Sequence, residues 1–143
     1  YELPPEAIRE MIINAHCHRN LLDESCIQVA VYDDRLEVTS PGGLYNGLTY
    51  EEVMNGHSKI RNKGIANIFS QMGLVEAWGS GIKRILNVAE EYGLPKPRFQ
   101  EFDNMFRVEL FRNSFPMTNE KESIGETSEK HRRSIGNRKT NRT

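Results

Sequence analysis

Apolar residues recur at helical spacing in some stretches of the chain and alternate with polar residues in others. Helical spacing after two prolines predicts a helix over residues 6–19. Alternation on both sides of Asp33-Asp34 predicts a β-hairpin over residues 27–39, which Ser-Pro-Gly-Gly at 40–43 ends because proline cannot continue a strand ladder. A long, mostly irregular loop then runs to Lys63, and a capping box at 49–52 predicts one short helix within it.

The later part of the chain repeats these two patterns and predicts four more elements. They are helices over residues 65–72 and from the turn at 79–81 to Gly93, then strands over residues 98–101 and 106–110 joined by a turn at Asp103-Asn104. The order of helix, two strands, loop, two helices and two strands predicts an α+β fold. We expect a mostly antiparallel sheet with helices on one face.

Composition narrows the class of protein. The chain has 143 residues, of which 37% are hydrophobic and 27% charged, and this is enough for one globular domain. No apolar run approaches the ~20 residues of a membrane span, so a membrane protein is not predicted. Cys17 and Cys26 are the only cysteines, which favours a reduced, cytoplasmic protein over a disulfide-stabilised one. The first residue is Tyr1 rather than Met, which indicates a piece of a longer protein.

Charge is distributed unevenly along the chain. Residues 120–143 hold seven Lys/Arg and four Asp/Glu, a net charge of +3, whereas the rest holds 12 and 16, a net charge of −4. Residues 113–143 contain few apolar side chains, so we expect a polar tail after a folded domain of residues 1–112. The tail is interpreted either as a solvated linker to another domain or as an arm that contacts nucleic acid. The acidic body itself argues against direct DNA binding.

The first predicted helix carries a polar stripe beside its apolar face. Glu10, Asn14 and His18 are spaced four residues apart, so their side chains lie in one row at the rim of the predicted core. A carboxylate and a carboxamide at such a rim can hold a divalent cation and a water molecule, which is what a nucleotide site requires. Polar residues four apart also occur on ordinary amphipathic helices, and this simpler interpretation remains open.

Two glycine turns and one basic residue are further candidates for phosphate contact. Gly79-Ser80-Gly81 opens a predicted helix, where backbone N–H groups and the helix dipole favour an anion. Gly42-Gly43 forms the other turn, and Arg61-Asn62 follows the long loop. Each has an ordinary alternative, namely a plain turn for either glycine pair, or a solvated arginine beside a helix-capping asparagine.

Taken in order, these features resemble the GHKL superfamily of ATPases, which includes gyrase, heat-shock chaperones, histidine kinases and mismatch-repair proteins. The resemblance is to the branch named for the C-terminal domain of RecG-related ATP-dependent helicases and covers about residues 1–112. The matching runs are Ala7-Ile8-Arg9-Glu10, Asn14-Ala15, His18-Arg19, Pro41-Gly42-Gly43-Leu44, Arg61-Asn62 and Gly79-Ser80-Gly81-Ile82.

The resemblance implies a two-layer α/β sandwich with ATP between helices and sheet under a lid made by the long loop. It implies that Glu10 activates the attacking water and that Asn14 holds a magnesium ion bridging the phosphates. The other nucleotide-binding residues that it implies are Gly42, Gly43, Arg61, Asn62, Gly79, Ser80 and Gly81.

The chain departs from the pattern of that family at two places. The aspartate that reads the adenine amino group is replaced here by Thr39 or Ser40, which puts adenine selectivity in doubt. Asn20 stands where the branch more often has aspartate. The chain also lacks a Gly-x-x-x-x-Gly-Lys-Ser/Thr loop, so a helicase motor is not predicted.

Two functions from different classes follow. The first is an ATP- and magnesium-binding regulatory domain, with ATP turnover left open, in a bacterial or archaeal transcriptional regulator. Members of this branch often follow a Schlafen-type AlbA domain, so DNA would be contacted through other domains or through the tail. The second is a degenerate GHKL-like module that binds no nucleotide and serves as a platform for dimerisation or docking. A homodimer is compatible with either.

Overall fold

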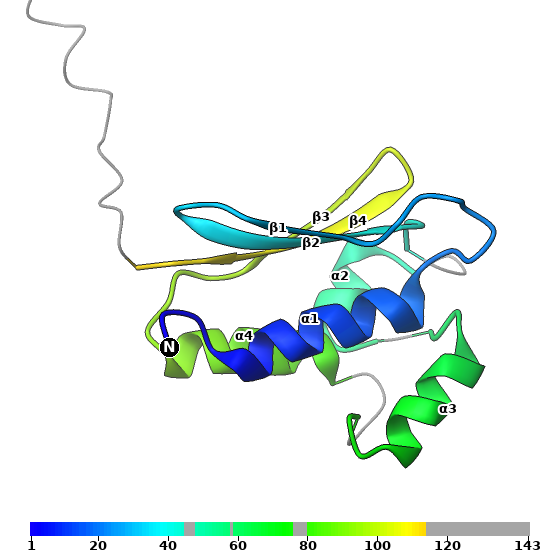
Figure 1. Cartoon of the computed structure of the whole chain (residues 1–143), viewed down its shortest axis with the longest axis horizontal. Coiled ribbons are helices and arrows are strands. Elements are labelled where there is room, and N and C mark those ends of the chain that lie inside the picture. The colour runs from blue at the N-terminus through cyan, green and yellow to red at the C-terminus, as the bar shows by residue number, and fades with distance from the viewer. Residues whose placement is uncertain (45–47, 58, 76–79, 114–143) are drawn as a thin grey trace, which may run out of the picture.

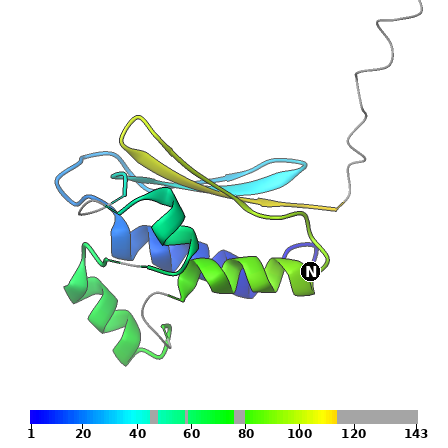
Figure 2. The same cartoon turned by 180° about the vertical axis from the view of Figure 1, so that it is seen from behind.

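The computed structural model describes residues 1–44, 48–57, 59–75 and 80–113. The elements are α1 (Pro5–His18), β1 (Gln28–Val31), β2 (Arg35–Pro41), α2 (Tyr50–Met54), α3 (Lys63–Gln71), α4 (Gly81–Glu91), β3 (Arg98–Phe102) and β4 (Met105–Phe111). The four strands form one antiparallel sheet in the order β1-β2-β4-β3. Helices α1 and α4 lie side by side along one face of this sheet (Figures 1 and 2). The predicted α+β fold with helices on one face is confirmed.

The local signals in the sequence explain where the elements begin and end. Pro5 occupies the first position of α1, where its missing N–H costs no hydrogen bond. The capping box at the start of α2 is present, because Thr49 and Glu52 each bond the backbone of the other. Asp103 and Asn104 have φ values of 46° and 58°, which suits a tight hairpin turn between β3 and β4.

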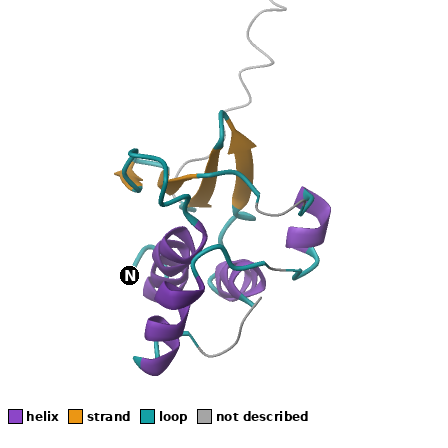
Figure 3. Ribbon diagram, turned by 90° about the vertical axis from the view of Figure 1, so that its right-hand side faces the viewer, coloured by secondary structure: helices purple, strands orange, loops and turns teal. Residues whose placement is uncertain are grey.

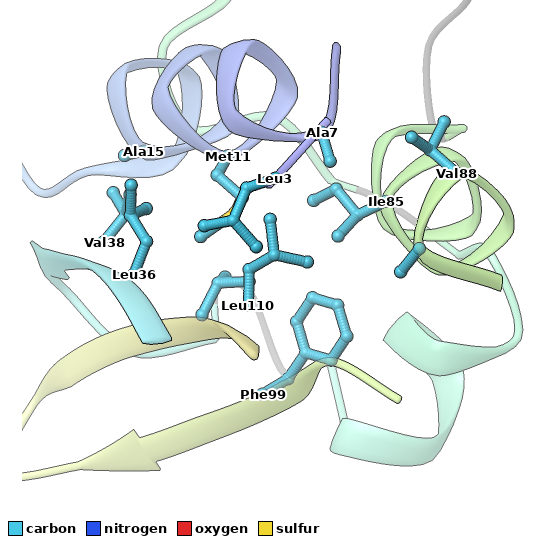
Figure 4. Close-up of a cluster of buried hydrophobic side chains, with 12 residues drawn as sticks. Leu3, Ala7, Met11, Ala15, Leu36, Val38, Ile85, Val88, Phe99 and Leu110 are labelled. Atoms are coloured by element: carbon cyan, nitrogen blue, oxygen red, sulfur yellow. The ribbon is translucent and has the colours of Figure 1, made fainter. Parts of the chain in front are cut away.

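The main core fills the space between the sheet and the two long helices, as Figure 4 shows. Side chains of β2 and β4 alternate, and every second one points toward the helices. The helix-facing pairs across these two strands are Leu36 with Leu110, Val38 with Val108, and Ser40 with Phe106. Figure 3 shows the resulting two layers, with the sheet above the helices.

A second, smaller cluster joins α3 to α1. Ile13, Cys17 and Ala66 are buried there. The apolar face predicted for α3 is covered only in part, since Ile68 and Met72 remain 57% and 64% exposed. Helix α3 therefore packs along one edge and lies beside the sandwich rather than within it (Figure 1).

Asn62 connects α3 to the end of α1. Its side-chain Nδ2 donates hydrogen bonds to the carbonyl oxygens of His16 at 3.0 Å and Arg19 at 2.8 Å, and its backbone N–H donates to Cys17 at 3.0 Å. The last carbonyls of a helix have no partner within the helix, so Asn62 satisfies groups that would otherwise need water. Asn62 precedes α3 but makes no side-chain cap for that helix.

The face of the sheet turned away from the helices carries a buried pair of carboxylates. Glu37 and Glu109 are direct neighbours across β2 and β4 and are 4% and 2% exposed. Arg98 donates two hydrogen bonds to Glu109, and Arg35 Nε donates to Glu37 at 2.8 Å. The hydrogen bonds from Arg98 hold the pKa of Glu109 below its usual value, although burial alone would raise it.

This lowered pKa makes part of the stability depend on pH. The ionised Glu109 carboxylate stabilises the fold above its ordinary pKa of 4.5, and this contribution is lost as the pH falls through the lower pKa of the folded state. We expect Glu109→Gln to reduce the free energy of unfolding by about 1–3 kcal/mol near neutral pH, because a charge-assisted hydrogen bond is lost. We also expect stability to fall less steeply on acidification in the variant.

Chemical denaturation of both proteins between about pH 7 and about pH 3 checks this expectation. Glu91→Gln, at the exposed end of α4, is the matched control and should keep the acid dependence of the wild type. Identical acid dependence in Glu109→Gln and the wild type would contradict the assignment to Glu109.

Candidate functional site

An open cavity lies between α1, the start of α4, the helix-facing side of β2 and β4, and the loop that contains α2. Its empty space is about 1090 Å³, counting the part open to solvent. Cavities that bind small molecules are mainly apolar with a few polar groups. The apolar part of the lining includes Met11, Val38, Val53, Ile60, Ile82, Ile85, Phe106 and Val108. The polar and glycine part includes Glu10, Asn14, His18, Ser40, Gly42, Gly43, His57, Lys59 and Gly81.

On α1, Glu10 and Asn14 lie between the side of the helix that packs in the main core and the side that packs in the smaller cluster. Met11 belongs to the main core and Ile13 to the smaller cluster, and the polar stripe runs between them. Glu10 is 8% exposed. Within the part of the chain that the structure describes, no group hydrogen-bonds the side-chain amide of Asn14. The rim position expected for this stripe is therefore observed, and both side chains line the cavity.

Gly81, the first residue of α4, lies directly against this pair. A Cβ atom on Gly81 would lie 2.7 Å from Glu10 Oε1 and 2.8 Å from Asn14 Oδ1, and nearer still to Asn14 Nδ2. Real side chains do not approach so closely, so a Cβ atom at this position would have to displace the ends of the Glu10 and Asn14 side chains. The fold thus brings together residues 10, 14 and 81, which the sequence proposed separately.

The Gly42-Gly43 turn lines the cavity, but its N–H groups point elsewhere. Gly42 N–H donates to the carbonyl of Asn104 at 2.7 Å, and Gly43 N–H donates to Asn104 Oδ1 at 3.4 Å. Arg61 Nη2 donates to the Gly43 carbonyl at 3.0 Å, and a Cβ on Gly42 would overlap the Arg61 guanidinium. With φ at +100°, Gly42 also adopts a backbone conformation that favours glycine. Gly42 thus makes room for Arg61, whereas a Cβ on Gly43 would overlap the Glu101 carboxylate.

The cavity carries basic groups from the loop after α2. His57 and Lys59 line it. Their role was not predicted from the sequence, because an irregular loop gives no signal of which way its side chains point. They place one cation and one imidazole beside a space that Glu10 also lines.

Cys17 and His18, near the end of α1, are both held in their neutral forms. Burial lowers the pKa of His18, and the positive charge of Arg61 lowers it further, against a hydrogen bond with the backbone of Lys59 that raises it. Burial, and then the negative charge of Glu10, raise the pKa of the Cys17 thiol to about 11. At neutral pH His18 is therefore an uncharged imidazole and Cys17 is an unreactive thiol.

The two residues at the end of β2, Thr39 and Ser40, point to opposite faces of the sheet, and only one of them lines the cavity. Ser40 points toward the helices and lines the cavity. Thr39 points to the opposite face, where Arg107 Nε donates to its hydroxyl at 3.0 Å. Ser40 is the residue available to a ligand.

The remaining predicted residues have mixed outcomes. Ser80 is the N-cap residue of α4, next to Gly81, although its side chain makes no cap hydrogen bond. Asn62 uses its amide N–H groups on α1, as described above. Gly79 and the tail beyond Asn113 lie outside the described residues.

In the described part of the chain there is no group of three His, Cys, Asp or Glu side chains able to hold a metal ion. None of the described helices has the length and apolar character to cross a membrane.

The fold is thus a two-layer α+β sandwich with a glycine-lined cavity between α1 and the sheet. The sequence profile of the family described as "Putative ATP-dependent DNA helicase recG C-terminal" matches residues 24–110. The chain belongs to this family. The match begins after α1 and therefore does not include Glu10 or Asn14.

One solved structure is similar over most of the chain. It is the DIP2311 protein from Corynebacterium diphtheriae, with 29% sequence identity and a TM-score of 0.71. The similarity covers 78% of this chain and 24% of that one, so the chain spans about a quarter of the length of its structural relative. A comparison with curated proteins found no match.

Proposed function

We propose that this domain binds a magnesium–nucleotide, ATP in the first instance, in the cavity between α1, α4 and β2. The observation that carries the proposal is the convergence of Glu10 and Asn14 on Gly81. A carboxylate, a carboxamide and a helix start without a side chain meet at one wall of an open cavity lined by apolar and polar side chains.

The residues present fit a magnesium ion held together with phosphates. Mg²⁺ prefers oxygen ligands and usually takes one or two from the protein, with water and substrate phosphates supplying the others. Asn14 Oδ1 is an oxygen donor of this kind. It lines the cavity, and within the described residues its amide has no hydrogen-bond partner. The ion would offset negative charge on the phosphates.

The surrounding charges favour a polyphosphate. Lys59 and His57 line the cavity, and the start of α4 contributes the partial positive charge of a helix N-terminus. Cations at a concave site attract anions most strongly where water is partly excluded. A nucleotide would place its phosphates toward Asn14 and Gly81.

Glu10 is positioned to act on water rather than on the ligand alone. Its carboxylate lies beside Gly81, one helical turn from Asn14, and Glu10 itself is 8% exposed. A carboxylate within reach of a bound water can orient it or accept its proton. We propose slow hydrolysis by this route and a regulatory role in a larger, DNA-linked protein, which the family resemblance supports.

Calorimetric titration with magnesium–ATP tests the proposal. We expect binding by the wild type, and a Kd at least about tenfold higher for Asn14→Ala, since a ligand to a charged group typically contributes ~1.5–3 kcal/mol. Glu10→Gln should retain binding and lose turnover, because glutamine keeps the shape of the side chain but cannot accept a proton.

Asn87→Ala, on the exposed side of α4, is the matched control and should bind as the wild type does. Absence of binding by folded wild-type protein with millimolar ATP and magnesium would overturn the proposal. That result would favour a docking or dimerisation module. Equal affinities of Asn14→Ala and Asn87→Ala would reject the role of Asn14 alone.

A further inference from the structure

Strand β1 leaves one of its sides unpaired, since among the described strands only β2 pairs with it. Tyr32 N–H donates to the carbonyl of Arg35 at 2.8 Å where the hairpin of β1 and β2 closes. Hydrogen-bonded and non-hydrogen-bonded pairs alternate along an antiparallel ladder, so Gln28 and Ala30 are the residues of β1 that bond β2. The backbone N–H and C=O groups of Val29 and Val31 therefore point to the open edge of the sheet.

The side chains of the same two valines are also exposed. Val29 and Val31 lie opposite Val38 and Leu36 and therefore point to the helix side of the sheet. Their neighbours on β2 are buried in the main core, but Val29 is 51% exposed and Val31 is 65% exposed. Unpaired backbone groups beside exposed apolar side chains are the surface that an added strand would cover.

The two edges of the sheet differ in charge. The other edge strand, β3, contains Arg98 and Glu101 and follows Pro97, and charges or prolines of this kind discourage pairing with a further strand. The sequence of β1 is Gln-Val-Ala-Val and contains neither. A two-fold interface places a strand against its own copy, so charges in that strand would lie near like charges. The uncharged β1 is therefore suited to pairing with itself.

We propose that a second copy of this chain pairs with β1 in antiparallel fashion, about a two-fold axis at Ala30. In this register Val29 lies opposite Val31 of the partner subunit, and each such pair can exchange both backbone hydrogen bonds through its open groups. Ala30 faces its own copy in a non-hydrogen-bonded pair, where side chains come closest, and a methyl group fits there. The two sheets become one, and the four valines cover one another on the helix side.

Sedimentation of the full chain over a range of concentrations tests the pairing. We expect a dimer with a Kd of roughly 10–100 µM, since an interface made by one short strand is small. Val31→Lys should raise this Kd at least about tenfold, because it brings two charges into the paired edges. Val31 is 65% exposed, so lysine is accommodated in the folded monomer, which circular dichroism checks.

Ile68→Lys is the matched control. Ile68 is a β-branched residue on α3 that is 57% exposed, and its replacement should leave the dimer unchanged. A dimer that Ile68→Lys dissociates and Val31→Lys does not would overturn the proposal and assign the contact to α3. A folded wild type that remains monomeric at concentrations approaching millimolar would overturn it as well. Neither result bears on the nucleotide site, because the pairing does not depend on it.

Cysteine cross-linking tests the register. Ala30→Cys, made together with Cys26→Ser to remove the exposed native thiol, should form a disulfide-linked dimer in oxidised glutathione. Gln28→Cys in the same background should not, because Gln28 lies opposite Tyr32 of the partner subunit and two cysteines bridge only when their Cα atoms are within ~7 Å. Equal cross-linking of the two variants, or none by Ala30→Cys in a protein that sediments as a dimer, would overturn the proposed register.

Discussion

Gly81→Ala is expected to fold normally and to bind magnesium–ATP at least about tenfold more weakly than the wild type. The added methyl group would occupy the space now taken by the ends of Glu10 and Asn14. Both are long enough side chains to turn aside, so the helix can still begin at this residue. The nucleotide affinity is expected to fall, because the carboxylate and the amide would leave the wall on which the phosphates are proposed to bind.

Gly64→Ala is the matched control for this substitution. Gly64 is the second residue of α3, and a Cβ atom there would meet nothing within 4 Å. Alanine stabilises helices relative to glycine by up to ~1 kcal/mol, so this variant should be as stable as the wild type or more stable, with unchanged nucleotide affinity. Thermal unfolding and calorimetric titration of the two variants give the comparison. Normal ATP affinity in Gly81→Ala would contradict the assigned position of the phosphates.

Leu110→Ala is expected to cause the largest loss of stability, about 2–5 kcal/mol. Leu110 is fully buried on β4, where it packs with Leu36 below α1 and α4 (Figure 4). Truncation removes apolar contacts and leaves a cavity that the two flanking layers can fill only by moving together. A loss of this size is a large fraction of the ~5–15 kcal/mol that stabilises a typical domain.

Urea denaturation of Leu110→Ala and Leu22→Ala compares the same truncation at a buried and at an exposed leucine, so that the effect of burial can be measured. Leu22 is 94% exposed, so its truncation should change the free energy of unfolding by less than about 0.5 kcal/mol. A change of less than about 1 kcal/mol in Leu110→Ala would show that the core is not closed around this residue.

The sequence predicted the elements well because each carries its own local signal. Pro5 begins α1, the Thr49 capping box begins α2, and Asp103-Asn104 turns the last hairpin. These signals depend on residues within a few positions of one another. The alternation of side chains along β2 also indicates which way its last residues point. Leu36 and Val38 point toward the helices, and Ser40 follows the same alternation.

The roles of residues that act across the fold could not be predicted in this way. Asn62 was expected to contact phosphate or to cap the helix that follows it, yet its amide bonds carbonyls at the end of α1. The Gly42-Gly43 turn was a candidate for phosphate contact, but its N–H groups donate to Asn104, in a hairpin far along the chain. Both outcomes depend on tertiary contacts that no local pattern specifies.

The candidate site combines features that a local pattern predicts with features that depend on tertiary contacts. The four-residue spacing of Glu10 and Asn14 placed them on one stripe, and the structure confirms that stripe at the rim of the core. Their meeting with Gly81 depends on the packing of α1 against α4, to which an ion pair between Glu6 and Arg84 at 2.9 Å also contributes. Spacing indicated which side chains share a surface, and only the fold showed what faces them.

The strand order β1-β2-β4-β3 also bears on how the domain is made. During synthesis α1 leaves the ribosome first, but β2 lies between β1 and β4 and must wait for the last strand to pair on its second edge. Until Phe111 has emerged, the apolar side of α1 has no complete sheet to cover it. Because local contacts form before distant ones, a nascent chain that stops short of β4 exposes its future core. The domain therefore cannot close its core until β4 has been synthesised.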